Sequence, residues 1–168
     1  QQARRSKTPV NSLVQAAMIA ALAEQRYPGQ SLPMRGISFA DMRSFLDPPL
    51  DGSLLGVAIS MLNYEVEVSP NRGLPDLAAD IQARLYQAAK IGDKSIAPLR
   101  SWPMMAMLIK RKTMRMGMTA LSFAGQMPLR QEFGSIRLRH VSGFVANNVL
   151  GPELAAYGKV LDGRLSVD

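Results

Sequence analysis

The sequence predicts a mixed α/β domain in which helices and strands form layers. Three observations favour this class. Two segments repeat apolar residues at helical spacing, one segment alternates apolar with charged residues, and an Asp-Gly pair separates two strand-like runs near the end. With 168 residues and 47% hydrophobic content, the chain is long enough for a core. We therefore expect a single domain over residues 1–168, with residues 1–7 as a flexible basic tail.

Three helices are expected. The first begins at Thr8-Pro9, a hydroxyl followed by proline, and ends near Arg26. Its expected buried face comprises Val10, Leu13, Val14, Ala17, Met18, Ala21 and Leu22. The second begins at Pro75 and stops at Gly92, and its buried face comprises Leu74, Leu77, Ala78, Ile81, Leu85 and Ala88. A third follows Pro103, and we interpret its cluster (Met104, Met105, Met107, Met114, Met116) as adaptable core rather than a binding surface.

Strands are expected at 32–39, within 55–70, at 119–125 and at 136–145, followed by a hairpin that turns at Asp162-Gly163. In the second of these, Tyr64, Val66 and Val68 alternate with glutamates, so one face is expected to be buried. His140 shares strand parity with Ile136 and Leu138. We therefore expect it to be a packed, hydrogen-bonded residue rather than a general base.

The residue types and motifs that the sequence lacks exclude several kinds of functional site. There is no cysteine and only one histidine, which excludes thiolate sites and two-histidine metal sites, and we expect no metal. No G-x-S-x-G, phosphate-loop or dinucleotide-binding motif is present. Asp41, Asp47 and Asp51 cluster in a proline-bearing segment, where turn and capping roles are expected. No run is long enough to span a membrane, and a cytoplasmic location is the expectation.

The net charge of +7 favours acidic partners such as nucleic acid, anionic lipid, phosphate-bearing cofactors or an acidic protein. The positive charges are densest at residues 4–7 and 110–115, which we interpret as solvated surface. The alternative is a nucleic-acid or membrane surface that uses Lys110, Arg111, Lys112 and Arg115. Neither cluster interleaves aromatic and basic residues, and no nucleic-acid motif is present, so we expect no nucleic-acid partner.

Four collinear segments carry a resemblance to a known family. They are TPVNSLVQAAMIAAL (8–22), ADMRSFLDPPLDGSLLGVAIS (40–60), ALSFAG (120–125) and AYGKVLDGRLSVD (156–168). In this order they resemble the C-terminal half of the acyltransferase superfamily that includes chloramphenicol acetyltransferase, peptide condensation domains and polyketide-associated acyltransferases. The resemblance implies a two-layer sandwich of a mixed, largely antiparallel sheet with helices on one face. It also implies a substrate tunnel between two similar halves.

The resemblance implies a reaction as well. The family's base is a histidine of a His-His-x-x-x-Asp-Gly motif in the N-terminal half, and this motif is absent from the sequence. The chain would then be inactive in isolation and would need that half as a partner, or would self-associate. The acyl donor would be a thioester of coenzyme A or of phosphopantetheine on an acidic acyl carrier protein, with no covalently bound cofactor. The acceptor would be a hydroxyl or an amine.

The resemblance places Ser122, Ala124, Gly125 and Gly56 along the tunnel, with Ser122 as an oxyanion donor. Arg43 would brace the two halves, and Asn11 would be structural. A surface role for Arg43 and a backbone-bonded role for Ser122 are the alternatives. Leu55-Gly56-Val57 and Ser122-Phe123 stand where relatives carry asparagine. A non-catalytic docking module for an acidic carrier protein or phosphopantetheine is therefore the alternative function.

The two ends of the sequence also favour a fragment. It begins with Gln1 rather than methionine, and its last strand-like run stops at Asp168. We expect a truncated C-terminal half.

Overall fold

The computed structural model describes residues 8–54, 56, 58–90, 93–111, 115–143 and 151–168, with only the backbone for 93–101. The expected tail at 1–7, Lys112, Met114 and the last two residues of the expected strand 136–145 lie outside these residues. The elements are α2 (Val10–Arg26), β1 (Leu32–Asp41), η1 (Arg43–Phe45), β2 (Ile59–Val68), α3 (Leu74–Lys90), α4 (Asp93–Lys110), β3 (Thr119–Gln126), β4 (Glu132–Phe133), β5 (Ile136–Arg137), β6 (Leu154–Leu161) and β7 (Arg164–Val167).

The main sheet has five strands in the order β2-β1-β3-β6-β7. The pairs β1–β2 and β6–β7 are antiparallel, whereas β1–β3 and β3–β6 are parallel. The α/β class with a mixed sheet is confirmed. Parallel neighbours need long connections, and the chain between β1 and β3 contains β2, α3 and α4.

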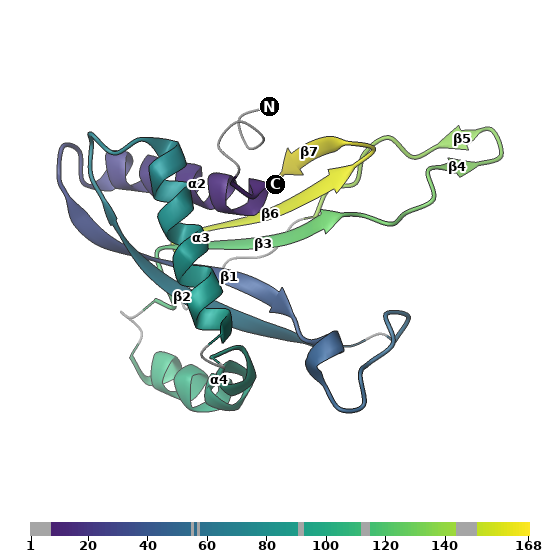
Figure 1. Cartoon of the computed structure of the whole chain (residues 1–168), viewed down its shortest axis with the longest axis horizontal. Helices are drawn as coiled ribbons and strands as arrows, with labels where there is room; N and C mark the ends of the chain where they lie inside the picture. Colours follow the sequence, from purple (N-terminus) through teal and green to yellow (C-terminus); the bar gives the residue numbers. More distant parts are fainter. Residues whose placement is uncertain (1–7, 55, 57, 91–92, 112–114, 144–150) are drawn as a thin grey trace.

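Helices α2 and α3 pack against one face of the sheet (Figure 1). The alternation predicted for β2 is confirmed, because its even-numbered residues from Ser60 to Val68 are buried beneath the helices. Four residues of the face predicted for α3 are also buried: Leu77, Ala78, Ile81 and Ala88. The shared core comprises Ala16, Ile19, Leu22, Ala23, Met34, Tyr64, Val66, Val68, Leu77, Ala78 and Ile81.

The buried face of α2 is rotated about the helix axis relative to the predicted face. The buried residues are Ser12, Gln15, Ala16, Ile19, Leu22 and Ala23, whereas Val10, Ala17 and Ala21 are exposed. A polar side chain can be buried when it has a partner, and Gln15 Nε2 donates to Asn11 Oδ1 at 2.9 Å. Of the apolar residues that periodicity selected, Leu22 is buried and Leu13 packs against the core, whereas Val10, Ala17 and Ala21 lie on an exposed flank of α2.

The third helix and its methionines also differ from expectation. Helix α4 begins well before Pro103, and Leu108 is buried among the side chains that are described from residue 102 onward. Met104 and Met105 are half-buried, whereas Met107 is 41% exposed. The core interpretation is therefore wrong for Met107, whereas its neighbour Leu108 is buried.

The strand expected at 136–145 is reduced to a two-residue pair, with Phe133 opposite Ile136. His140 follows β5 in a non-regular segment and is exposed, so its expected place on a packed apolar face was wrong. Its ring Nε2 lies 2.6 Å from Ser142 Oγ, and the expected hydrogen bond is present. The parity argument failed because no neighbouring strand extends the pairing beyond Arg137 among the described residues.

The C-terminal hairpin is confirmed. Asp162 and Gly163 both have positive φ, at 51° and 70°, as a type I′ turn requires. The outer strand is fixed at its end by Asp168, whose main chain exchanges two hydrogen bonds with Tyr157. Within the described residues, no helix has the length and apolar character needed to cross a bilayer.

Candidate functional site

The parallel strands β1, β3 and β6 all end at the same edge of the sheet, which we name the carboxyl edge. Three segments leave from it: the loop 42–58 after β1, the arm 127–143 after β3, and the turn 162–163 after β6. Figure 1 shows the loop and the arm projecting beyond the sheet on this side. Ala124 and Gly125 lie near the end of β3, and Gly56 lies in the loop after β1, so the fold brings these three to the same edge, whereas Ser122 lies in the middle of β3.

Ser122 lies on the sheet face opposite α2 and α3. Its neighbour Leu121 pairs with Ser38, whose hydroxyl accepts a hydrogen bond from Gln15 of α2 at 3.4 Å. Successive strand residues point to opposite faces, so Ser122 points away from the helices. Its partner on β6 is Tyr157, and both side chains are half-buried. The same face is covered in part, since Ile37 and Lys159 are buried on it, and Ser122 itself remains partly exposed.

Ala124 and Gly125 lie at a bulge in β3. The pairing with β6 shifts register between Phe123 and Gln126, and Gly125 has a φ of 69°. This left-handed conformation favours glycine because a side chain would be strained there. The bulge therefore gives Gly125 a backbone role, separate from any role in leaving space for a ligand. Ala124 is exposed at the carboxyl edge.

Arg43 holds the loop 42–58 together. Its Nη2 donates to the Gly56 carbonyl at 3.0 Å, and its Nη1 lies 3.3 Å from Asp41 Oδ1. Its own carbonyl accepts from the Leu50 amide at 3.0 Å. The backbone hydrogen bond from Arg43, its charge and its side chain together lower the pKa of Asp41. Among the described residues, Arg43 thus braces one loop internally, and Gly56 supplies a carbonyl to it.

The expected turn and capping roles apply to two of the three aspartates. Asp41 Oδ1 accepts from the Arg43 amide at 3.0 Å, and Asp51 Oδ1 accepts from the Ser53 amide at 2.7 Å. The hydrogen bonds from Ser53 lower the pKa of Asp51. Both carboxylates are therefore used locally.

Asn11 is positioned as a structural residue. Its Oδ1 accepts from Gln15 Nε2, which also reaches Ser38, so the three residues link α2 to β1. This network lies on the helix-covered face, on the other side of the sheet from Ser122. Asn11 is therefore not brought together with the candidate tunnel residues.

Two buried polar residues add to this description: the burial of Tyr64 was predicted, whereas that of Lys159 was missed in the sequence. Tyr64 is buried across Gly36, where an added Cβ would overlap its ring, and burial raises the pKa of Tyr64 to about 12. Lys159 is 1% exposed, and its Nζ contacts Asp168 Oδ2, which also accepts from the Gly143 amide at 2.9 Å. Lys159 has the same strand parity as Tyr157, and this was the one signal in the sequence that could have indicated its burial. Nothing in the sequence indicated that Asp168 would be its partner.

Two cavities lie outside this set of residues. One, of about 500 Å³, is bordered by Arg35, Glu65, Arg115 and Glu153, and the other, of about 150 Å³, by arginines of the arm and of β7. Neither is lined by Ser122, Ala124, Gly125 or Gly56. Among the described residues, no three acidic or histidine side chains form a group that could hold a metal ion.

Two solved structures share this architecture. The structure of polyketide synthase associated protein 5 from Mycobacterium tuberculosis matches with a TM-score of 0.63 and 18% identity, over 98% of this chain and 40% of that one. The crystal structure of vinorine synthase matches with a TM-score of 0.58 and 16% identity, over 99% and 39%. The chain therefore spans about two fifths of the length of either protein. No functionally curated protein sequence matches it.

These likenesses show the fold, and it is the fold expected for the C-terminal half of a chloramphenicol acetyltransferase-like enzyme. The family comparison extends from residue 1 to residue 167 and so covers nearly all of the sequence. The chain belongs to the family of acyltransferase domains described as the phthiocerol/phthiodiolone dimycocerosyl transferase C-terminus.

Proposed function

We propose that this chain forms one wall of the active site of a thioester-dependent acyltransferase whose other wall and catalytic base belong to an N-terminal half. The observation that carries this proposal is the family match over residues 1–167. The donor would be an acyl thioester of coenzyme A or of a phosphopantetheinyl carrier protein, and the acceptor a hydroxyl or an amine.

The carboxyl edge supports the proposal because it exposes apolar side chains on two segments. The loop carries Phe45, Leu46, Leu50 and Leu54, and the arm carries Leu129, Phe133 and Ile136, all at least 40% exposed. Apolar surface gathered in this way is typical of an interface. A second half seated against this edge would cover it and would face Ser122. In its absence we expect the chain to self-associate, which sizing at rising concentration would detect.

The proposed reaction needs a base and an oxyanion donor. The base of the partner half would take the proton of the acceptor as its oxygen or nitrogen attacks the thioester carbonyl. The tetrahedral intermediate would then expel the thiolate, which leaves as the thiol once protonated. Ser122 would donate its hydroxyl hydrogen to the oxyanion of that intermediate.

A thiol-release assay tests this proposal. The chain would be combined with an N-terminal half that carries the His-His-x-x-x-Asp-Gly motif, and supplied with an acyl thioester and an alcohol or amine. We expect release only from the combination, and a fall in kcat of about 10²–10³ for Ser122→Ala with KM little changed. Ser166→Ala on β7 is the control. Equal rates for Ser122→Ala and the wild-type chain would remove Ser122 from the mechanism.

The alternative is a docking module without catalysis. It is favoured by Val57 and Phe123, which stand where relatives carry polar side chains, and by the net charge of +7. It predicts binding of an acidic carrier protein that weakens between low and high salt, without thiol release from any combination. Carrier affinity that is independent of salt would count against it.

A further inference from the structure

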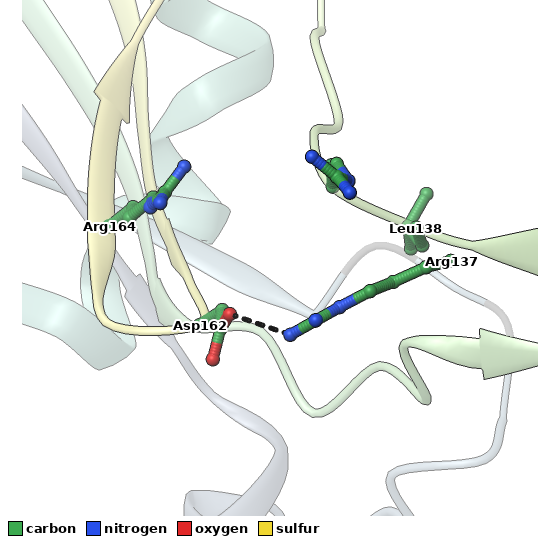
Figure 2. A pocket seen from close by; sticks show the side chains of 5 residues that line it. Arg137, Leu138, Asp162 and Arg164 are labelled. Carbon is green, nitrogen blue, oxygen red and sulfur yellow. Dashed lines mark ion pairs between the residues drawn. The ribbon is translucent and has the colours of Figure 1, made fainter.

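The smaller cavity is bounded by two segments that are distant in the sequence. Arg137, Leu138 and Arg139 come from the arm, whereas Asp162 and Arg164 come from the β6–β7 hairpin. Its volume is about 150 Å³, many times what a single water needs. Figure 2 shows Arg137 extending from the arm toward Asp162 at the turn. The cavity therefore lies where the arm meets the sheet.

The lining has an excess of positive charge. The lining contains three arginines and one aspartate, which is an excess of two positive charges. Arg137 Nη2 lies 3.5 Å from Asp162 Oδ2, and this ion pair uses the one carboxylate among the described residues that line the cavity. Glu132 lies opposite Arg137 in the β4–β5 pair but does not border the cavity. Within the described part of the chain, no ion pair involves Arg139 or Arg164.

We propose that this cavity binds a phosphate group, with Arg139 and Arg164 as its ligands and the Arg137–Asp162 pair as a fixed wall. Guanidinium groups are planar donors that match the oxygens of phosphate and keep their charge at all working pH values. A doubly charged anion would balance the two uncompensated charges, which otherwise repel each other. A bound phosphate would also link the arm to the hairpin, because its two ligands come from different segments.

Two sources can supply this chemistry: free inorganic phosphate, and the phosphate of a phosphopantetheine group. Only the second source rests on the proposed acyl transfer, since the cavity and its charges do not depend on it. The two can be separated by titrating each compound into the same protein. Equal affinities indicate a site for phosphate alone, whereas tighter phosphopantetheine binding that needs the same arginines indicates the larger ligand.

The test is calorimetric titration of the full chain with inorganic phosphate at low ionic strength. The variant R139Q/R164Q should bind at least about tenfold more weakly than the wild-type chain, because two charged donors are lost. The control K90Q/K110Q removes the same number of positive charges from the ends of α3 and α4 and should bind as the wild-type chain does. Unchanged thermal unfolding of each variant would show that the fold is retained.

Asp162→Asn provides a test in the opposite direction. Asparagine tolerates the positive φ of this position, so the turn should persist. Removal of the carboxylate frees Arg137, and phosphate binding should tighten by a few fold. The proposal is overturned if phosphate does not saturate the wild-type chain, if K90Q/K110Q weakens binding as much as R139Q/R164Q, or if Asp162→Asn weakens it.

Discussion

Between α2, α3 and the sheet, large apolar side chains are shielded from solvent, whereas similar side chains at the carboxyl edge face it. Ile19 and Ile81 are 0% exposed under the helices, but Phe133 on the arm is 54% exposed and Phe45 in the loop is 58% exposed. The helix-covered face can therefore stabilise the chain by itself. The carboxyl edge gains little from its apolar residues until another surface covers them.

The largest expected effect separates these two regions directly. Ile19→Ala should lower the free energy of unfolding by about 2–5 kcal/mol, because it leaves a cavity in a packed core. Phe133→Ala should change it by less than about 0.5 kcal/mol, because the ring is largely solvated. Urea unfolding of both variants checks this. A cost for Phe133→Ala as large as that for Ile19→Ala would show that the arm belongs to the core.

Gly36→Ala tests the packing on the sheet face that α2 and α3 cover. A Cβ at this position would overlap the buried ring of Tyr64, so we expect destabilisation by about 1–3 kcal/mol. The control is Gly52→Ala, since nothing lies within 4 Å of a Cβ there. Thermal unfolding would give both values. Tyr64→Leu should make Gly36→Ala less costly, and a full cost in that background would show that the ring is not the obstacle.

The Lys159–Asp168 pair tests how the C-terminal hairpin is held on the sheet face opposite α2 and α3. The hydrogen bond from Lys159 and that from the Gly143 amide lower the pKa of Asp168 below its ordinary 3.8. The folded pKa is the lower one, so this stabilisation is complete above pH 3.8 and disappears as the pH falls through the folded value. Asp168→Asn should lose stability at neutral pH because Lys159 is left buried without its partner, whereas Lys159→Met should lose less.

Unfolding midpoints measured across acidic and neutral pH check this prediction. The difference between the wild-type chain and Asp168→Asn should shrink as the pH falls below 3.8. A difference that stays constant across that range would show that the charge of Asp168 does not contribute.

The smallest global effect is expected in the loop. Arg43→Met removes contacts to Asp41 and Gly56 from a partly exposed site, and such pairs contribute up to about 1 kcal/mol. Amide exchange in residues 42–58 should accelerate, while exchange in α3 should be unchanged. Arg84→Met, which removes an exposed pair with Asp80, is the control. Equal acceleration in α3 would mean that the effect of Arg43→Met is not local.

The fold was largely predictable from local patterns, as the alternation in β2, the stripe of α3 and the Asp162-Gly163 turn show. The buried face of α2 was not, because periodicity ranks apolar residues and cannot know that Gln15 finds partners in Asn11 and Ser38. The prediction for His140 was wrong for a related reason. Its strand parity could place it on a packed face only if another strand paired with this segment, and among the described residues none does beyond Arg137.

For the candidate site, the sequence could predict which residues to consider but not how the chain arranges them. Collinear motifs placed Ser122, Gly125 and Gly56, and the parallel strands bring the last two to one edge of the sheet. The left-handed conformation of Gly125 and the arginine-lined cavity depend on contacts between distant segments. Such contacts leave no mark at a fixed spacing in the sequence.

Hydrogen exchange of the chain, free and mixed with an N-terminal half that carries the His-His-x-x-x-Asp-Gly motif, tests the central claim most directly. If the carboxyl edge receives that half, protection should appear in the loop 42–58 and the arm 127–143. The outer face of α3, where Tyr86 is 61% exposed, should exchange as before. Protection confined to α3, or none at a concentration that saturates thiol release, would contradict the account.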